Sequence, residues 1–140
     1  YDLRADMQNP ACHNLELVGL SERVTLKTRD IADGFDETDA PALFLDVPNP
    51  WDYLEQAHRA LRSGGFFGAL LPTTNQVTTL LTELQRRSFG LTEVVEVLLR
   101  NYKTVAARFR PADRMVAHTG YLVFARALQP AQPPSQPVAR

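Results

Sequence analysis

The sequence contains one cysteine, Cys12, among its 140 residues. A single thiol excludes an internal disulfide and any metal site built from several cysteines, so we expect Cys12 to be a buried or half-buried small side chain. No other cluster suggests a metal ligand set. No apolar run approaches the roughly 20 residues that cross a bilayer, and no signal-peptide pattern opens the chain. We therefore expect a cytoplasmic protein with no membrane partner.

The sequence also lacks an excess of charge of either sign. Its formal net charge is -1 at pH 7, which excludes a global attraction to nucleic acid. The basic residues are nevertheless uneven, because residues 86–114 hold seven of them against three acidic ones: Arg86, Arg87, Arg100, Lys103, Arg108, Arg110 and Arg114. This segment forms either a local basic surface or an ordinary solvated one, and the sequence favours neither.

What is present is the composition of one globular domain. Hydrophobic residues make up 44% and charged residues 22% of the chain, and 140 residues are enough to bury a core. We expect this domain to span residues 1–128. Residues 129–140 contain four prolines and no large apolar side chain beyond one valine, so we expect a disordered tail there.

The most informative stretch is a strand-to-helix junction in the first half of the chain. Residues 42–45, Ala-Leu-Phe-Leu, form an apolar run typical of a buried parallel strand, and a helical pattern covers residues 51–62. Between them, Asp46 lies on a loop stiffened by Pro48 and Pro50. Ligands of open α/β sheets bind outside the carboxyl ends of strands, so Asp46 is a candidate site residue. The alternative is an ordinary turn whose aspartate solvates the strand end.

A second junction of the same kind follows. The sequence Ser-Gly-Gly at residues 63–65 predicts a break, and residues 66–71 read as another buried strand. The loop after it leads into a helix at Val77, with Thr73 or Thr74 as its N-cap. Because both strands are expected to be parallel neighbours, the two loops should lie at the same end of the sheet.

The remaining patterns also indicate an α/β fold. A helix is predicted from Asn9 to a C-capping Gly19, and the strict alternation of residues 23–29 predicts a half-buried strand near a sheet edge. Residues 91–105 read as a long strand, residues 108–114 as a basic loop, and residues 121–124 as a closing strand.

Several short motifs, in the right order, carry a family resemblance. Residues 46–51, Asp-Val-Pro-Asn-Pro-Trp, resemble the Asp-Leu-Pro-x-Pro-Trp signature of the tRNA adenine-58 N1-methyltransferases. Residues 71–77 resemble the family's Leu-Pro-x-x-x-Gln-Val, and residues 1–4 resemble Tyr-Glu-x-Arg with Asp2 in place of glutamate. The resemblance implies a Rossmann-like S-adenosylmethionine-dependent methyltransferase fold, a three-layer sandwich ending in an antiparallel strand pair.

The same resemblance implies roles for individual residues. Asp46 would be catalytic, accepting a hydrogen bond from the exocyclic amine of adenine and favouring the cationic product. Asp2 would bind the ribose hydroxyls of S-adenosylmethionine, and Asp30 and Ile31 would face its adenine, with Asp46 also near the cofactor. The expected substrate-binding residues are Pro48, Trp51, Gln76, Arg100 and His118.

Each of the main assignments has an ordinary alternative. Asp2 would otherwise be a surface carboxylate at a frayed terminus, and Asp30 a turn residue or helix cap. Gln76 would otherwise face solvent in the first turn of its helix, and His118 would be structural, bonded to a backbone carbonyl.

The family's first cofactor motif, a strand followed by a glycine-rich loop, is missing from this sequence, as is its small N-terminal β domain. We therefore expect a C-terminal portion of a longer enzyme that binds cofactor poorly and is inactive alone. Without the first two strands, the strand at residues 23–29 would lack neighbours and the strand at residues 42–45 would present an open edge.

Three functions follow from the resemblance. The first is a tRNA methyltransferase that acts on N1 of adenine in the T-loop, with tRNA as partner and, as is typical of the family, a homotetrameric assembly. The second is a non-catalytic tRNA-binding subunit of a related complex. The third is a methyltransferase of the same fold with a different acceptor.

Overall fold

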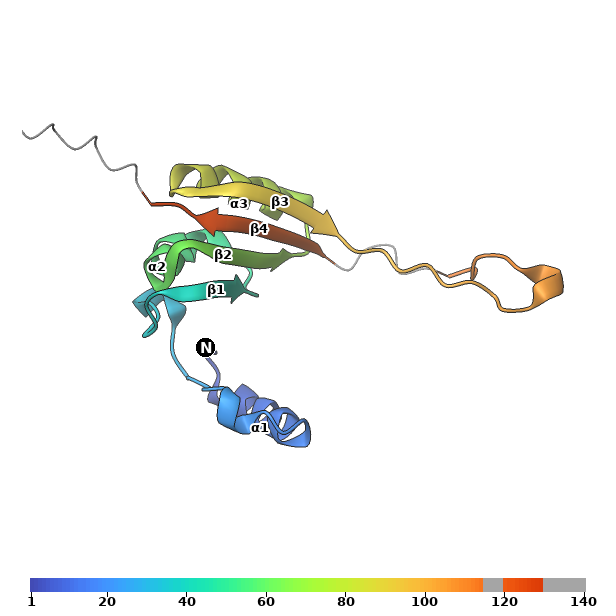
Figure 1. Ribbon diagram of the computed structural model, residues 1–140, viewed down its shortest axis with the longest axis horizontal. Coiled ribbons are helices and arrows are strands. Elements are labelled where there is room, and N and C mark those ends of the chain that lie inside the picture. The colour runs from blue at the N-terminus through green and yellow to red at the C-terminus, as the bar shows by residue number, and fades with distance from the viewer. Residues whose placement is uncertain (115–119, 130–140) are drawn as a thin grey trace, which may run out of the picture.

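The structure of the protein is a computed structural model that describes residues 1–114 and 120–129. Its centre is a four-stranded sheet in the order β1-β2-β4-β3 (Figure 1). The strands are β1 (Ala40–Leu45), β2 (Leu61–Leu71), β3 (Phe89–Glu96) and β4 (Tyr121–Ala127). β1 and β2 are parallel, whereas β4 runs antiparallel to both β2 and β3. The two predicted parallel strands and the C-terminal antiparallel pair are thereby confirmed. β1 is not buried as predicted, because Leu45 is its one buried residue and Phe44 is exposed on the uncovered face of the sheet.

One face of this sheet is covered by two helices. α2 (Leu54–Ala60) follows a 3₁₀ helix at Pro50–Tyr53, and α3 (Thr74–Arg86) begins after Thr73, whose side chain accepts a hydrogen bond from the Gln76 N–H. The predicted cap at Thr73 is confirmed. Alternate side chains of β2 and β4 meet the helices in a fully buried core that includes Leu54, Phe67, Leu71, Leu80, Leu84 and Val123.

The opposite face of the sheet is open in the part of the chain that the structure describes. Phe44 and Phe66 lie on it with exposed fractions of 53% and 51%, and the Arg126 guanidinium lies 3.2 Å from the centre of the Phe66 ring. Helix α1 (Gln8–Leu17) packs mainly on the 3₁₀ helices at Ala5–Met7 and Ser21–Arg23 rather than on the sheet. The described residues therefore form two of the three expected layers, and β1 is an open edge as predicted.

The first helix lies where it was predicted, but its first residue and the exposure of Cys12 differ from the prediction. α1 begins at Gln8, one residue before the predicted cap, and Gly19 follows it with φ +69°, the conformation that favours glycine after a helix. Cys12 is exposed, so the prediction of a buried thiol was wrong. The reason is that α1 has no sheet to pack against on the side of Cys12 in the described residues.

The strand predicted at residues 23–29 was also wrong. Here the chain forms a 3₁₀ turn and then a single bridge, in which the Asp2 N–H donates to the Lys27 carbonyl and the Arg29 N–H donates to the Asp2 carbonyl, both at 3.0 Å. Alternating polar and apolar side chains are typical of a strand, but a strand also needs a neighbouring strand to accept and donate its backbone hydrogen bonds. With Asp2 as the one partner residue, a bridge forms instead of a ladder.

The long strand predicted at residues 91–105 is shorter than expected, and the closing strand is longer. β3 ends at Glu96, which pairs with Tyr121 at the start of β4, and β4 continues to Ala127. Residues 97–114 leave the sheet as an extended hairpin, which we call the basic arm (Figure 1). Pairing with β4 sets the end of β3, because residues 97–114 have no strand of the sheet beside them.

The break predicted at residues 63–65 lies inside β2 instead of before it. Pairing jumps from Ala40–Leu61 to Ala42–Phe66, so the extra residues form a bulge against β1. Gly64, with φ +71°, takes the left-handed conformation that this bulge requires.

In the described residues no helix is long and apolar enough to cross a membrane, and no group of three metal-ligating side chains lies together. The predicted tail falls almost wholly on residues 130–140, outside the described residues.

Neighbouring phenylalanines of β2 provide a direct test of this core. Phe67 is fully buried, and Phe66 is half exposed on the other face. We expect Phe67→Ala to lower the free energy of unfolding by about 3–5 kcal/mol. Phe66→Ala should cost about 1 kcal/mol, mostly through its contact with Arg126. Urea unfolding followed by circular dichroism measures both, and equal losses would contradict the assignment of faces.

Candidate functional site

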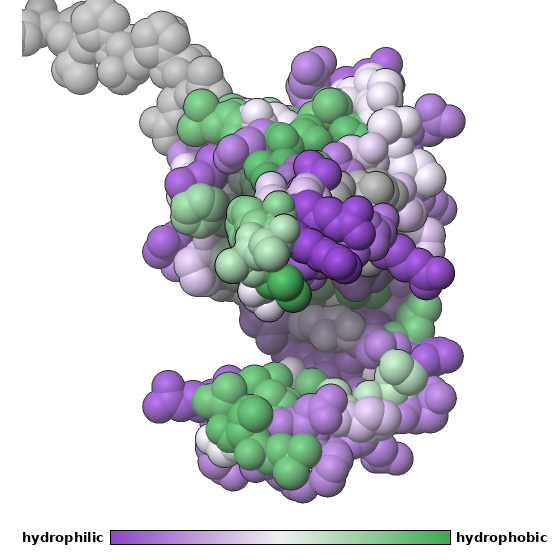
Figure 2. Space-filling model, turned by 90° about the vertical axis from the view of Figure 1, so that its right-hand side faces the viewer, coloured by the Kyte–Doolittle hydropathy of each residue, from purple (hydrophilic) through white to green (hydrophobic). Residues whose placement is uncertain are grey.

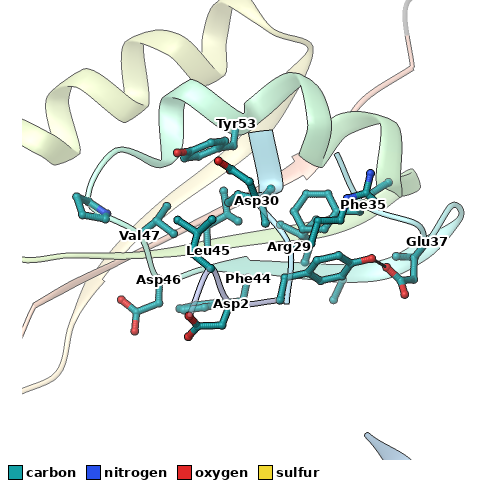
Figure 3. A pocket seen from close by; sticks show the side chains of 18 of the residues that line it. Asp2, Arg29, Asp30, Phe35, Glu37, Phe44, Leu45, Asp46, Val47 and Tyr53 are labelled. Carbon is teal, nitrogen blue, oxygen red and sulfur yellow. Dashed lines mark hydrogen bonds between the residues drawn. The ribbon is translucent and has the colours of Figure 1, made fainter. Parts of the chain in front are cut away.

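A cavity of about 1040 Å³ opens beside the carboxyl end of β1 (Figure 3). Its lining comes from residues 1–4, from the segment between Arg29 and Glu37, and from β1 with the loop that follows it, together with Tyr53 and Ala60 from the two helices after that loop. Five of the sequence-predicted site residues line this one cavity: Asp2, Asp30, Ile31, Asp46 and Pro48. Residues far apart in the sequence thus converge where the sheet geometry places a ligand.

Asp46 is placed by the burial of its neighbours. Leu45, the last residue of β1, is 4% exposed, and Pro50 is buried at the start of the next 3₁₀ helix, so the loop between them is anchored at both ends. The Asp46 carboxylate is exposed and forms no hydrogen bond with a residue that the structure describes. Both of its oxygens can therefore accept hydrogen bonds from a ligand.

Asp2 and Asp30 are each held by a backbone N–H. The Arg4 N–H donates to Asp2 Oδ1 at 2.8 Å, and the Ala32 N–H donates to Asp30 Oδ1 at 2.8 Å. Asp30 thus caps the short 3₁₀ helix at Ile31–Asp33, which is the ordinary use of such a residue, while also lining the cavity. In Figure 3, Asp2 and Asp46 point the same way along one side of the cavity, and Asp30 lies on the side of Tyr53.

Gln76 joins the two strand-to-helix loops. Its Nε2 donates to the Pro48 carbonyl at 3.1 Å, and its Oε1 accepts from Thr73 Oγ1 at 2.6 Å. The expectation that the two loops lie side by side is confirmed. Gln76 is half-buried and braces the Asp46 loop, and it does not itself line the cavity.

The other expected substrate-binding residues lie away from the cavity. Trp51 is half-buried against the core, and Arg100 is exposed on the basic arm, beyond the end of β3. His118 lies outside the described residues.

The structure also shows a polar cluster that the sequence interpretation missed. We call it the clasp; its members are Tyr1, Lys27, Arg29, Asp36 and Glu37. Lys27 Nζ lies 3.0 Å from Asp36 and 2.5 Å from Glu37, and Arg29 pairs with Asp36. The Tyr1 hydroxyl donates to Glu37 and accepts from the Asp36 N–H at 2.8 Å. Three members of the clasp, Tyr1, Arg29 and Glu37, line the cavity. The clasp is also tied to Asp2, whose backbone is hydrogen-bonded to the backbones of Lys27 and Arg29.

These contacts shift the ionisation of the clasp. The hydrogen bond from Lys27, followed by that from Tyr1, lowers the pKa of Glu37 from 4.5 to about 2. The hydrogen bond to Glu37 and then that to Asp36 raise the pKa of Lys27, and Lys27 in turn lowers the pKa of Asp36. Lys27, Asp36 and Glu37 therefore remain charged at neutral pH.

The wall of the cavity is apolar and aromatic. Tyr1 meets Phe35 edge-to-face, with ring centres 5.1 Å apart, and Ile31, Leu43 and Val47 are partly buried against the core. A flat, apolar ring with polar edges suits such a wall, because carboxylates lie at its margins.

A family model described as "tRNA methyltransferase complex GCD14 subunit" matches residues 1–109. The chain belongs to this family. The matched residues include all those that line the cavity, so the site described above lies wholly within the part of the chain that is shared with the GCD14 family.

Among curated proteins, the chain is similar to tRNA (adenine(57)-N(1)/adenine(58)-N(1))-methyltransferase TrmI of Methanocaldococcus jannaschii, with 28% identity over 90% of this chain and 54% of that protein. It is also 35% identical to tRNA (adenine(58)-N(1))-methyltransferase TrmI of Thermus thermophilus, over 59% of this chain and 32% of that protein. The chain therefore spans about half the length, or less, of the curated relatives it matches.

Among solved structures, an S-adenosylmethionine-dependent O-methyltransferase of Thermotoga maritima gives a TM-score of 0.91 at 50% identity, over 95% of this chain and 50% of that one. The tRNA (m1A58) methyltransferase TrmI of Aquifex aeolicus gives 0.84 at 43% identity, over 91% of this chain and 52% of that one. The predicted fold class, that of Rossmann-like S-adenosylmethionine-dependent methyltransferases, is confirmed.

The clasp should make the folding stability of this GCD14 family chain depend on pH in the acid range. Because the pKa of Glu37 is lower in the folded protein than its ordinary value of 4.5, its stabilising effect is complete above pH 4.5 and is lost as the pH falls toward 2. We expect the urea midpoint of the parent protein to fall more steeply between pH 5.5 and 2.5 than that of Glu37→Gln.

Glu22→Gln is the matched control, since Glu22 is exposed and forms no ion pair within residues 1–114 and 120–129. It should follow the parent curve. An unchanged acid dependence in Glu37→Gln would show that the clasp does not form in solution.

Proposed function

We propose that this chain is part of an S-adenosylmethionine-dependent tRNA adenine-58 N1-methyltransferase, which transfers a methyl group to N1 of an adenine in the T-loop. The observation that carries the proposal is the convergence of Asp2, Asp30 and Asp46 on one cavity at the carboxyl end of β1. The printed activities of the relatives from M. jannaschii, T. thermophilus and A. aeolicus support it.

The residues of the cavity fit S-adenosylmethionine. One oxygen of Asp2 is engaged by Arg4, which leaves the other to accept hydrogen bonds from ribose hydroxyls. Asp30 likewise keeps one oxygen for the amine of an adenine ring, and Ile31 and Phe35 supply an apolar wall for that ring. When bound, the cofactor supplies an electrophilic methyl group on a sulfonium sulfur.

Asp46 would bind and orient the acceptor base and stabilise the charge that develops on it. Its carboxylate accepts a hydrogen bond from the exocyclic amine, which orients the adenine with N1 facing the site. Adenine becomes cationic on methylation at N1, and a nearby carboxylate stabilises the positive charge as it develops. Because Asp46 has no described protein partner, it begins the reaction with both oxygens available.

The further substrate contacts remain part of this proposal. Pro48, braced by Gln76, would shape the loop beside the flipped base, and Trp51 would fix the start of the helix behind it. Arg100 would contact RNA from the basic arm, and His118, which lies outside the described residues, is likewise proposed to bind substrate. Assembly as a homotetramer and a cytoplasmic location are likewise proposed.

The decisive variant is Asp46→Asn, which keeps the shape and removes the charge. We expect it to lower methyl transfer to tRNA by about 10²–10³-fold, the typical loss for one electrostatic transition-state contact. Transfer of labelled methyl from S-adenosylmethionine to a tRNA transcript measures this loss in a version of the protein extended to the length of the relatives. The 140-residue chain, which we expect to be inactive alone, is measured beside it.

Asp52→Asn is the control, because Asp52 is exposed on the 3₁₀ helix at Pro50–Tyr53 and does not line the cavity. It should keep the parent rate, and a transcript without adenine at the target position should accept no methyl. If the parent protein binds tRNA in both forms but transfers no methyl, the non-catalytic subunit replaces this proposal.

A further inference from the structure

The basic arm, residues 97–114, projects from the end of the sheet at which β1 and β2 also finish (Figure 1). β3 runs toward this end, and the arm continues past it, away from the body. The arm carries five basic residues and one acidic residue, Asp113, although the whole chain has a net charge of -1. Positive charge is thus concentrated beyond the end of the sheet at which Asp46 lies.

The arm is a hairpin with its own backbone bonds. The Lys103 N–H donates to the Arg110 carbonyl at 2.9 Å, and the Ala112 N–H donates to the Asn101 carbonyl at 2.8 Å. Asp113 pairs with Lys103 and Arg110. The three other cations form no ion pair with any residue that the structure describes, and all are exposed: Arg100, Arg108 and Arg114.

An aromatic pair lies among these charges. Tyr102 and Phe109 stack across the hairpin, with ring centres 5.3 Å apart and an angle of 16° between the rings, yet they remain 48% and 68% exposed. Exposed aromatic rings interleaved with cations are typical of surfaces that bind RNA, where bases stack on the rings and phosphates meet the cations.

The exposed state of the arm indicates that it has a partner, because an isolated two-stranded hairpin is only marginally stable in water. Its apolar residues, such as Leu98 and Leu99, would suit a second copy of the chain. Its charge favours RNA, since two copies of the arm facing one another would bring like charges together around a symmetry axis.

We propose that the basic arm binds the phosphate backbone of the tRNA whose target adenine lies at Asp46. This inference rests on the proposed function for the identity of the RNA. Figure 2 looks along the arm onto the same end of the molecule, where hydrophilic residues gather at the centre above a hollow between the body and the lower lobe that holds α1. An RNA held by the arm would lie across this hollow.

The test is fluorescence anisotropy of a labelled, unmodified tRNA transcript titrated with the 140-residue chain between 50 and 200 mM salt. We expect the triple variant Arg100→Gln, Arg108→Gln, Arg114→Gln to bind at least about tenfold more weakly at low salt. The slope of log K against log salt should fall by about two to three, because each lost phosphate contact removes about 0.7–0.9.

The matched control is Arg59→Gln, Arg62→Gln, Arg86→Gln, which removes the same charge from exposed positions at the end of α2, the start of β2 and the end of α3. It should change the affinity by less than about twofold, and thermal unfolding should confirm that both variants fold. Equal losses in the two variants would overturn the proposal, as would an absence of tRNA binding by the parent chain. A change of oligomeric state in the arm variant with unchanged RNA affinity would assign the arm to self-association instead.

The experiment distinguishes failure of the proposal for the arm from failure of the proposed function. In a version of the protein extended to the length of the relatives, the arm variant should bind S-adenosylhomocysteine as the parent does, because no residue of the arm lines the cavity. If RNA binding depends on the arm but no form of the protein transfers methyl, the arm assignment stands and the methyltransferase proposal fails.

Discussion

The parallel pairing of β1 with β2 is the constraint on which the rest of the structure depends. This pairing places Ala42 opposite Phe66 and Leu45 opposite Ala69, and so brings the carboxyl ends of both strands to the same end of the sheet. The two loops that follow are then close enough for the hydrogen bond between Gln76 and the Pro48 carbonyl. α2 and α3 return across one face and bury the core, so the position of the Asp46 loop follows from packing rather than from the loop alone.

The distribution of charge follows a related division. The cavity carries carboxylates with few intramolecular partners, whereas the clasp neutralises its own charges at the far end. The excess of cations lies on the basic arm, outside the cavity. On the proposed function this division is useful, because the reacting base gains positive charge near Asp46 while the polyanionic backbone is held elsewhere.

Local patterns predicted the two strand-to-helix junctions well, because an apolar run, a proline-braced loop and a threonine cap are encoded within a few residues. Features that need a distant partner were missed. Residues 23–29 alternate as a strand but find Asp2 alone to pair with, and β3 stops where β4 no longer lies beside it. The clasp joins Tyr1 to Lys27 and Glu37, a contact that no short motif reveals. The shared site of Asp2 and Asp46 was expected from family resemblance, not from spacing.

The most direct test of the account is a calorimetric titration of S-adenosylmethionine into the 140-residue chain and into a version extended to the length of the relatives. We predict binding to the extended form, weakened about tenfold or more by Asp2→Ala, because Asp2 supplies a fixed acceptor in the cavity. Binding by neither form, or binding that Asp2→Ala leaves unchanged, would contradict the assignment of this cavity to the cofactor.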